Sequence, residues 1–126
     1  MTIIRHDDVS LPIGIGTRSR LPSRKLVTDK VGAQHSELWE QFMPAGGEIP
    51  IHYHPVEEIV TFLTGQVEVT IGAETTIVTA PATVFIPIEV LHGFRTHGAE
   101  TVHLLAFFPT SNPQTLYQDW SDDPSG

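Results

Sequence analysis

The chain has 126 residues, of which 7 are basic and 15 are acidic, so its formal net charge is −8. This length fits one domain, and a hydrophobic content of 40% is enough to bury a core, which excludes a disordered chain. The absence of cysteine excludes disulfides, thiol nucleophiles and thiolate metal sites, so any chemistry depends on histidines, carboxylates, hydroxyls or a cofactor. No apolar run reaches the length of a membrane span, and the first ten residues lack a signal-like apolar stretch. We therefore expect a cytoplasmic protein with no membrane partner.

The charges divide unevenly along the chain. Residues 1–30 hold six of the seven basic residues and three acids, a balance of +3, whereas residues 31–126 hold one arginine and twelve acids, a balance of −11. This distribution predicts a basic N-terminal arm, residues 1–30, lying on an acidic body. An acidic body repels phosphate and the arm lacks interleaved aromatic residues, which argues against a nucleic-acid partner.

After the arm, the sequence consists of short β-type runs separated by turn residues. The predicted strands, in chain order, are residues 37–43, 58–63, 67–71, 75–78, 83–86 and 101–108. The run at 67–71 shows the clearest two-residue period, with three aliphatic residues alternating with polar ones. No segment sustains a helical period, so residues 31–110 are predicted to form an all-β sandwich or barrel. Residues 111–126 read as a polar tail, anchored by Leu116, Tyr117 and Trp120.

Four residues form a pattern that suits metal binding. His52 and His54 are two residues apart, so they point to the same face of a strand, and Glu58 shares their parity. His92 follows another β-type run forty residues later and can return opposite the first three in a closed barrel. Any one such histidine alone is more often a solvated or hydrogen-bonded side chain. Together, three imidazoles and a carboxylate make a good site for a divalent first-row metal.

The spacing of these residues resembles the two motifs of the cupin superfamily. The stretch Gly46-x5-His-x-His-x3-Glu-x6-Gly65 matches the first motif at every position. The stretch from Pro87 to His92 resembles the second motif, Pro-x-Gly-x-x-His, with Glu89 where the glycine belongs. That departure makes the turn before His92 the uncertain part of the motif, because a non-glycine residue resists a left-handed backbone.

The resemblance implies a small double-stranded β-helix (jelly-roll) barrel with an N-terminal arm. It also implies a divalent transition metal as cofactor, which could be Fe, Mn, Ni, Co, Cu or Zn. Glu57 is a rival ligand to Glu58, but it leaves only two residues after His54 instead of the three in the motif. The ligands that carry over are His52, His54, Glu58 and His92.

Strand parity predicts what surrounds such a site. If His92 points inward, Phe94 does too, and Val60 and Phe62 follow Glu58 on its face, which gives an apolar substrate pocket. His103 lies on the last predicted strand and either lines the pocket or sits at the barrel edge. No Lys or Arg occurs between residues 31 and 94, so the pocket has few fixed cations. Small chelating substrates, such as diketones, catechol-like compounds and carboxylates, fit this better than phosphorylated ones.

The resemblance makes oxygen-dependent C–C cleavage, as in cupin dioxygenases, the leading reaction, with Glu58 as metal ligand and proton acceptor. A non-redox isomerase, lyase or decarboxylase, in which the metal is a Lewis acid, is the first alternative. A binding module without turnover is the second. We also expect a homodimer, because the apolar and basic arm can cover an exposed sheet edge of a partner. The same arm can instead wrap its own barrel.

Overall fold

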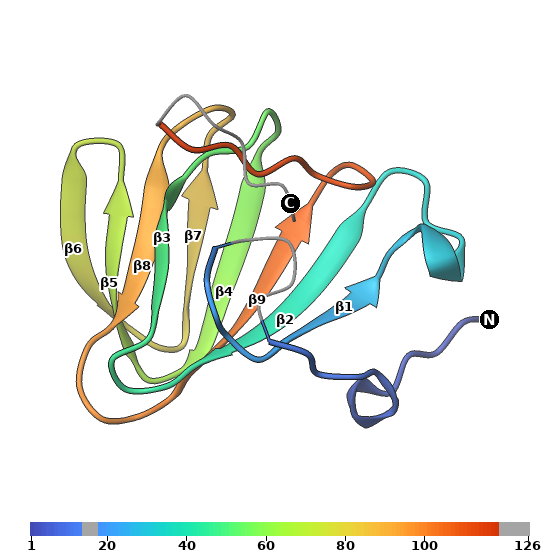
Figure 1. Cartoon of the computed structure of the whole chain (residues 1–126), viewed down its shortest axis with the longest axis horizontal. Coiled ribbons are helices and arrows are strands. Elements are labelled where there is room, and N and C mark those ends of the chain that lie inside the picture. The colour runs from blue at the N-terminus through green and yellow to red at the C-terminus, as the bar shows by residue number, and fades with distance from the viewer. Residues whose placement is uncertain (14–17, 119–126) are drawn as a thin grey trace.

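Two antiparallel sheets packed face to face make up the computed structural model, which describes residues 1–13 and 18–118 (Figure 1). One sheet has the strand order β1-β2-β9-β4-β7, and the other has the order β3-β8-β5-β6. The described strands are β1 (Ser23–Val27), β2 (Glu37–Met43), β3 (Glu48–His52), β4 (Glu58–Thr64), β5 (Gln66–Ile71), β6 (Glu74–Thr79), β7 (Ala82–Ile86), β8 (His92–Thr96) and β9 (Val102–Phe108). Two short 3-10 turns, η1 (His6–Asp8) and η2 (Asp29–Val31), flank β1. The prediction of an all-β jelly roll is confirmed.

Each predicted strand is present, and its residue pattern explains why it forms. In β5, Val67 and Val69 are buried while Glu68 and Thr70 face outward, as the two-residue period requires. A tight turn at Gly72, with φ of +60°, joins β5 to β6 in a hairpin. The two strands pair without a register shift, from Gln66 opposite Thr79 to Ile71 opposite Glu74. Among the described helices, none is long and apolar enough to cross a membrane.

The core lies between the inner faces of the two sheets. Side chains from β4, β8 and β9 meet there, and the rings of Phe62 and Phe94 pack edge to face with centroids 5.4 Å apart. Val60 and Leu104 fill the space beside them. This apolar interior holds the two sheets together, and one end of it carries the polar cluster described below.

The arm predicted for residues 1–30 is partly built into the barrel. Residues 23–27 form β1, which pairs with β2 and becomes one edge of the five-stranded sheet. Leu21 and Leu26 are buried, so this half of the arm packs on its own chain. Residues 5–8, by contrast, form an exposed turn beside the sheet (Figure 1).

Candidate metal centre

The four predicted ligands come together in the barrel interior. The donor atoms of His52, His54, Glu58 and His92 all lie within 4.8 Å of one another, and all four side chains are buried. His52 ends β3 and pairs directly with His92 at the start of β8, so both rings occupy the same face. Glu58 begins β4 in the opposite sheet, and His54 lies in the loop between β3 and β4. The cluster therefore joins the two sheets.

Each imidazole is oriented by a backbone carbonyl that accepts from its Nδ1. His52 donates to Pro50 O at 2.7 Å, and His92 donates to Val90 O at 2.9 Å. A carbonyl oxygen can only accept, so Nδ1 carries the proton in these rings. That tautomer leaves the Nε2 lone pair for the centre of the cluster, which is the arrangement found around metal-bound histidines.

His54 follows the same rule with a carbonyl from far along the chain. Its Nδ1 donates to Gln114 O at 2.6 Å, sixty residues away. Its Nε2 lies 3.4 Å from Glu58 Oε1, and the same oxygen is 3.0 Å from Nε2 of His92. Three inward Nε2 atoms around one buried carboxylate form a donor set that fits a divalent transition metal.

The protonation states of the cluster suit a metal as well. Burial, reinforced by the neighbouring His92 and His54, lowers the pKa of His52 to about 3. Burial raises the pKa of Glu58, but the close His54 and His92 rings outweigh it and bring that pKa to about 2. A neutral imidazole and an ionised carboxylate are the forms that bind metals.

The structure answers two questions that the sequence leaves open: which glutamate belongs to the cluster, and how the turn before His92 forms without a glycine. Glu57 is exposed while Glu58 is buried in the cluster, so Glu58 is the carboxylate at this site. Glu89 adopts the left-handed conformation of the glycine it replaces, with φ of +64°. Its N–H donates to His54 O at 2.9 Å, so the turn before His92 keeps its shape without a glycine.

A model of the cupin domain family matches residues 39–108, which is more than half of the chain. The chain belongs to the cupin family. Among curated proteins, the polyketide synthase CurC of Streptomyces cyaneus is 36% identical to this cupin over 76 residues. The match covers 60% of this chain and 49% of CurC, so it spans about half the length of that relative.

Solved structures with the same fold extend the likeness to almost the whole chain. The polyketide cyclase RemF from Streptomyces resistomycificus superposes with a TM-score of 0.83 at 26% identity, covering 99% of this cupin and 90% of RemF. A protein of Thermotoga maritima described as a predicted oxalate decarboxylase has a TM-score of 0.78 at 16% identity, covering 86% and 99% of the two chains. The second likeness concerns the fold alone.

The predicted pocket residues on β4 and β8 lie inside the barrel of this cupin. Val60, Phe62 and Phe94 are almost fully buried, and the Phe94 ring lies 6.0 Å from the ring of His92. They form an apolar wall that runs from the ligand cluster into the core. Whether substrate touches this wall stays a prediction.

Sequence reasoning missed a second aromatic contact of the cluster. The ring of Phe108 packs edge-on against His54, with centroids 4.9 Å apart, and lies tilted against Trp39, with centroids 4.7 Å apart. Phe108 shares the inward face of Leu104, but Leu105 and Phe107 on the outer face are equally apolar, so the sequence carries no clear signal for it.

His103, which the sequence places either in the pocket or at the barrel edge, does not join this interior. On β9, Val102 and Leu104 point inward, so His103 points to the outer face of the sheet. There its Nε2 lies 2.7 Å from Oε2 of Glu40, and its ring stacks on Phe42.

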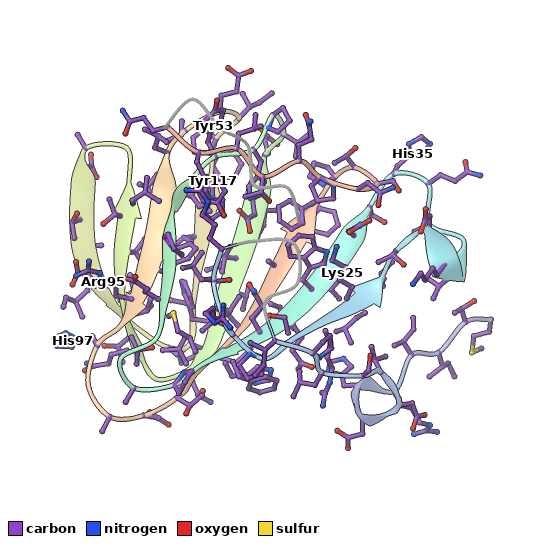
Figure 2. The ribbon with its side chains drawn as sticks, viewed as in Figure 1. Lys25, His35, Tyr53, Arg95, His97 and Tyr117 are labelled. Carbon is purple, nitrogen blue, oxygen red and sulfur yellow. The ribbon has the colours of Figure 1, made fainter. Side chains whose placement is uncertain are left out.

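Glu40 is the centre of a separate, outer cluster. It accepts from His103, from His6 at 3.0 Å and from Arg24 Nη1 at 3.0 Å. Burial raises the pKa of Glu40, but these three hydrogen bonds leave it lower than usual. The outer cluster binds the turn at residues 5–8 to the outer face of the sheet. It contains none of the four residues of the candidate metal centre. The other two histidines, His35 and His97, are exposed at the periphery (Figure 2).

The residues after β9 pass over the ligand cluster, and we call residues 112–117 the C-terminal strap. Leu116 and Tyr53 pair their backbones as antiparallel neighbours, which places Thr115 opposite His54 and Tyr117 opposite His52. Tyr117 is buried, and its ring lies 6.2 Å from that of His52. The tail is therefore docked through Leu116 and Tyr117 as predicted, while Trp120 lies outside the described residues. Figure 1 shows the strap in red across the top of the molecule.

Proposed function

We propose that this cupin is a metal-dependent enzyme that closes rings in small poly-β-ketone substrates by redox-neutral condensation. The observation that carries the proposal is the convergence of three imidazoles and Glu58 on one buried point beside an apolar wall. RemF, named as a polyketide cyclase, supports this substrate class, because it is 26% identical to nearly all of this chain. The partial match to CurC, named as a polyketide synthase, supports it independently.

The four ligands would hold a divalent cation, which supplies Lewis acidity and so lowers the pKa of a carbonyl compound that binds through its oxygens. Glu58 is the one carboxylate of the set and is the predicted acceptor of a proton from the carbon between two carbonyls. That carbon then bonds to a carbonyl carbon farther along the same substrate, whose oxygen takes up a proton. Loss of one water completes a conjugated ring, so no oxidant is consumed.

The apolar wall supports this chemistry by excluding water. Val60, Phe62 and Phe94 offer no polar atom from their side chains, so a reactive polyketone bound beside them is protected from hydrolysis and from uncontrolled ring closure. Between residues 31 and 94 the chain has no Lys or Arg. An uncharged chain of ketones suits a site with so few fixed cations better than a phosphorylated substrate does.

Thr115 adds one polar group to this face. Its side chain is buried opposite His54, and its Oγ1 has no hydrogen-bond partner in the part of the chain that the structure describes. A buried hydroxyl without a partner costs about 1–3 kcal/mol. A ketone oxygen of the substrate would supply that partner, and we assign Thr115 this orienting role.

The test is a cyclisation assay with a synthetic linear poly-β-ketone ester. Protein loaded with zinc should form a product that has lost one water and gained aromatic absorbance, faster than buffer containing the same free metal. Glu58→Gln should retain the fold and lose most of this rate. If the loaded protein does not exceed the buffer control, the proposed cyclisation is wrong. A Glu58→Gln variant with full metal content and full rate would refute the role of Glu58 alone.

Oxygen-dependent C–C cleavage, the reaction expected first from the sequence, remains the second candidate. The same three imidazoles and carboxylate favour it, because they also suit a redox-active metal. The two reactions differ in their need for dioxygen, which cleavage consumes and condensation does not. Turnover that continues without air and with zinc supports condensation. Turnover that requires both iron and air supports cleavage.

We also propose that the protein is a homodimer. In the single chain, β1 of the arm pairs with β2 of the same chain, so it does not support an arm that covers a partner. The support for a dimer comes from another surface. Leu38, Phe107, Ile59 and Phe85 form one apolar row across the outer face of the five-stranded sheet, and Phe85 is 53% exposed. Sedimentation at micromolar concentration tests this, and Phe85→Lys should give a monomer. The cytoplasmic location expected from the sequence stays a prediction.

A further inference from the structure

The histidines of the metal centre differ in where their orienting carbonyl comes from. Pro50 O serves His52 and Val90 O serves His92, each from two residues earlier on the same chain segment. His54 instead depends on Gln114 O, which belongs to the C-terminal strap. The correct ring orientation of His54 therefore requires that the strap stay in place.

The strap is fixed at its middle by backbone pairing. Leu116 N donates to Tyr53 O at 2.9 Å, and Tyr53 N donates to Leu116 O at 2.8 Å. Tyr53 stands between His52 and His54 in the sequence, so these two bonds hold the strap against the segment that carries both ligands. Figure 2 labels Tyr53 and Tyr117, the residue that follows Leu116 in the strap.

The strap is fixed at its start by a buried carboxylate. Asn112 N donates to Glu37 Oε2 at 2.8 Å, and Trp39 Nε1 donates to Glu37 Oε1 at 2.8 Å. Asn112 itself is left-handed, with φ of +51°, a conformation that asparagine tolerates better than most residues. The chain therefore turns from β9 into the strap at a defined point.

At its end, the strap contacts a second ligand and the N-terminal part of the chain. The Tyr117 ring lies beside His52, and its hydroxyl accepts from Arg18 N at 2.8 Å. The Arg18 guanidinium lies 3.8 Å above the same ring. Tyr117 thus packs between His52 and the segment that precedes β1.

We propose that the C-terminal strap is a positioning element of the metal centre, which sets metal affinity through Gln114 and Tyr117 and is itself ordered by the bound metal. The first half follows because loss of an orienting hydrogen bond on a metal-binding histidine weakens affinity about 10–100-fold. The second half follows because such coupling is reciprocal. This inference rests on the metal-dependent function proposed above, but its test measures binding and not turnover.

The main variant is Leu116→Pro, which removes the N–H that donates to Tyr53 and so frees Gln114 O from His54. Competition with a chromophoric chelator should show Co²⁺ affinity about 10–100-fold below that of the unmodified protein. The Co²⁺ absorption spectrum should also change, because His54 is no longer held in place. Ala33→Pro removes a comparable turn hydrogen bond, to Thr28 O in the β1–β2 connection, and should leave affinity and spectrum unchanged.

A second pair of variants separates packing from tethering. Tyr117→Ala removes the ring beside His52 and should lower Co²⁺ affinity about tenfold, within the range expected for a supporting contact. Tyr117→Phe keeps the ring and loses the hydroxyl that accepts from Arg18 N, so its affinity should stay close to that of the unmodified protein. Phe42→Ala, an aromatic loss on the outer face, is the matched control and should not change affinity.

Hydrogen exchange of the unmodified protein gives a readout that needs no variant. Zn²⁺ should slow exchange of the Leu116 and Tyr53 amides and leave the β5–β6 hairpin unaffected. Co²⁺ affinity in Leu116→Pro equal to that of Ala33→Pro, or strap exchange indifferent to Zn²⁺, would overturn the inference. Coupling as described in a protein that fails the cyclisation assay would support the strap and refute only the proposed reaction. A protein that binds no metal would overturn both.

Discussion

Replacing Glu89 by glycine should stabilise the protein. Glu89 is held at a φ of +64° by the turn that leads to His92, and its side chain is exposed. A residue with a Cβ carries a penalty of about 1–2 kcal/mol in this region, which glycine does not. Glycine in turn costs about 0.4–1 kcal/mol more conformational entropy on folding. The balance predicts a gain of about 0.5–1 kcal/mol for Glu89→Gly.

Urea unfolding of the metal-free protein measures this gain as a higher midpoint at constant slope. At about 2.1 cal/mol/K per residue, the entropy of unfolding a chain of this length converts the gain into roughly 2–4 °C of melting temperature. The bond from the residue 89 N–H to His54 O does not involve the side chain, so Co²⁺ affinity should be unchanged.

Two control variants isolate the backbone term from the loss of the carboxylate. Glu89→Ala removes the charge but keeps the Cβ, so it should not produce the gain. Glu100→Gly introduces glycine at an exposed position with an ordinary negative φ, and it should destabilise the protein slightly. The reasoning is refuted if Glu89→Gly is no more stable than Glu89→Ala, because the left-handed backbone would then carry no strain.

Three further predictions concern the site. His54→Ala should abolish stoichiometric Co²⁺ binding, measured by metal analysis after dialysis, while the far-ultraviolet circular dichroism of the barrel persists. Thr115→Val should raise the free energy of unfolding by about 1 kcal/mol, because a buried unpaired hydroxyl is replaced by a methyl group, and it should slow cyclisation; a loss of stability would show that the hydroxyl has a partner. The metal-free protein should lose stability in acid: the pKa of His52 falls from 6.5 unfolded to about 3 folded, so the unfolded chain binds more protons between these values. Glu58, with a pKa of about 2 against 4.5 unfolded, adds a loss of the same sign between pH 4.5 and 2, and urea midpoints across this range check both.

The sequence predicts those features of the structure that are set by interactions between residues close together in the chain. Val67 and Val69 alternate with polar neighbours, and β5 was predicted from that period alone. The spacing of His52, His54 and Glu58 likewise predicted a cluster, since strand parity and one loop bring them together.

Sequence reasoning missed two kinds of feature. One is a contact between segments far apart in the chain, and the other is the orientation of a strand with two apolar faces. The orientation of His103 was left open because Leu105 and Phe107, on the outer face of β9, are as apolar as the inward residues, so the two-residue period is hidden. The role of Gln114 resides in a backbone carbonyl, which every residue has, and therefore leaves no signature in the sequence. The basic side chains of β1 are typical of a solvated segment, so its sequence does not reveal that it forms an edge strand of the sheet.

The different origins of the carbonyls that orient the three histidines of the candidate metal centre have a consequence for how this protein can evolve. His52 and His92 are oriented by carbonyls of their own segments, and the apolar core that holds the sheets together continues beyond the ligand cluster. The backbone that orients these two rings therefore does not depend on any other part of the chain. His54 is the exception, because its orientation is encoded sixty residues downstream. Lineages that lengthen, shorten or lose the strap should therefore diverge in chemistry before they diverge in fold.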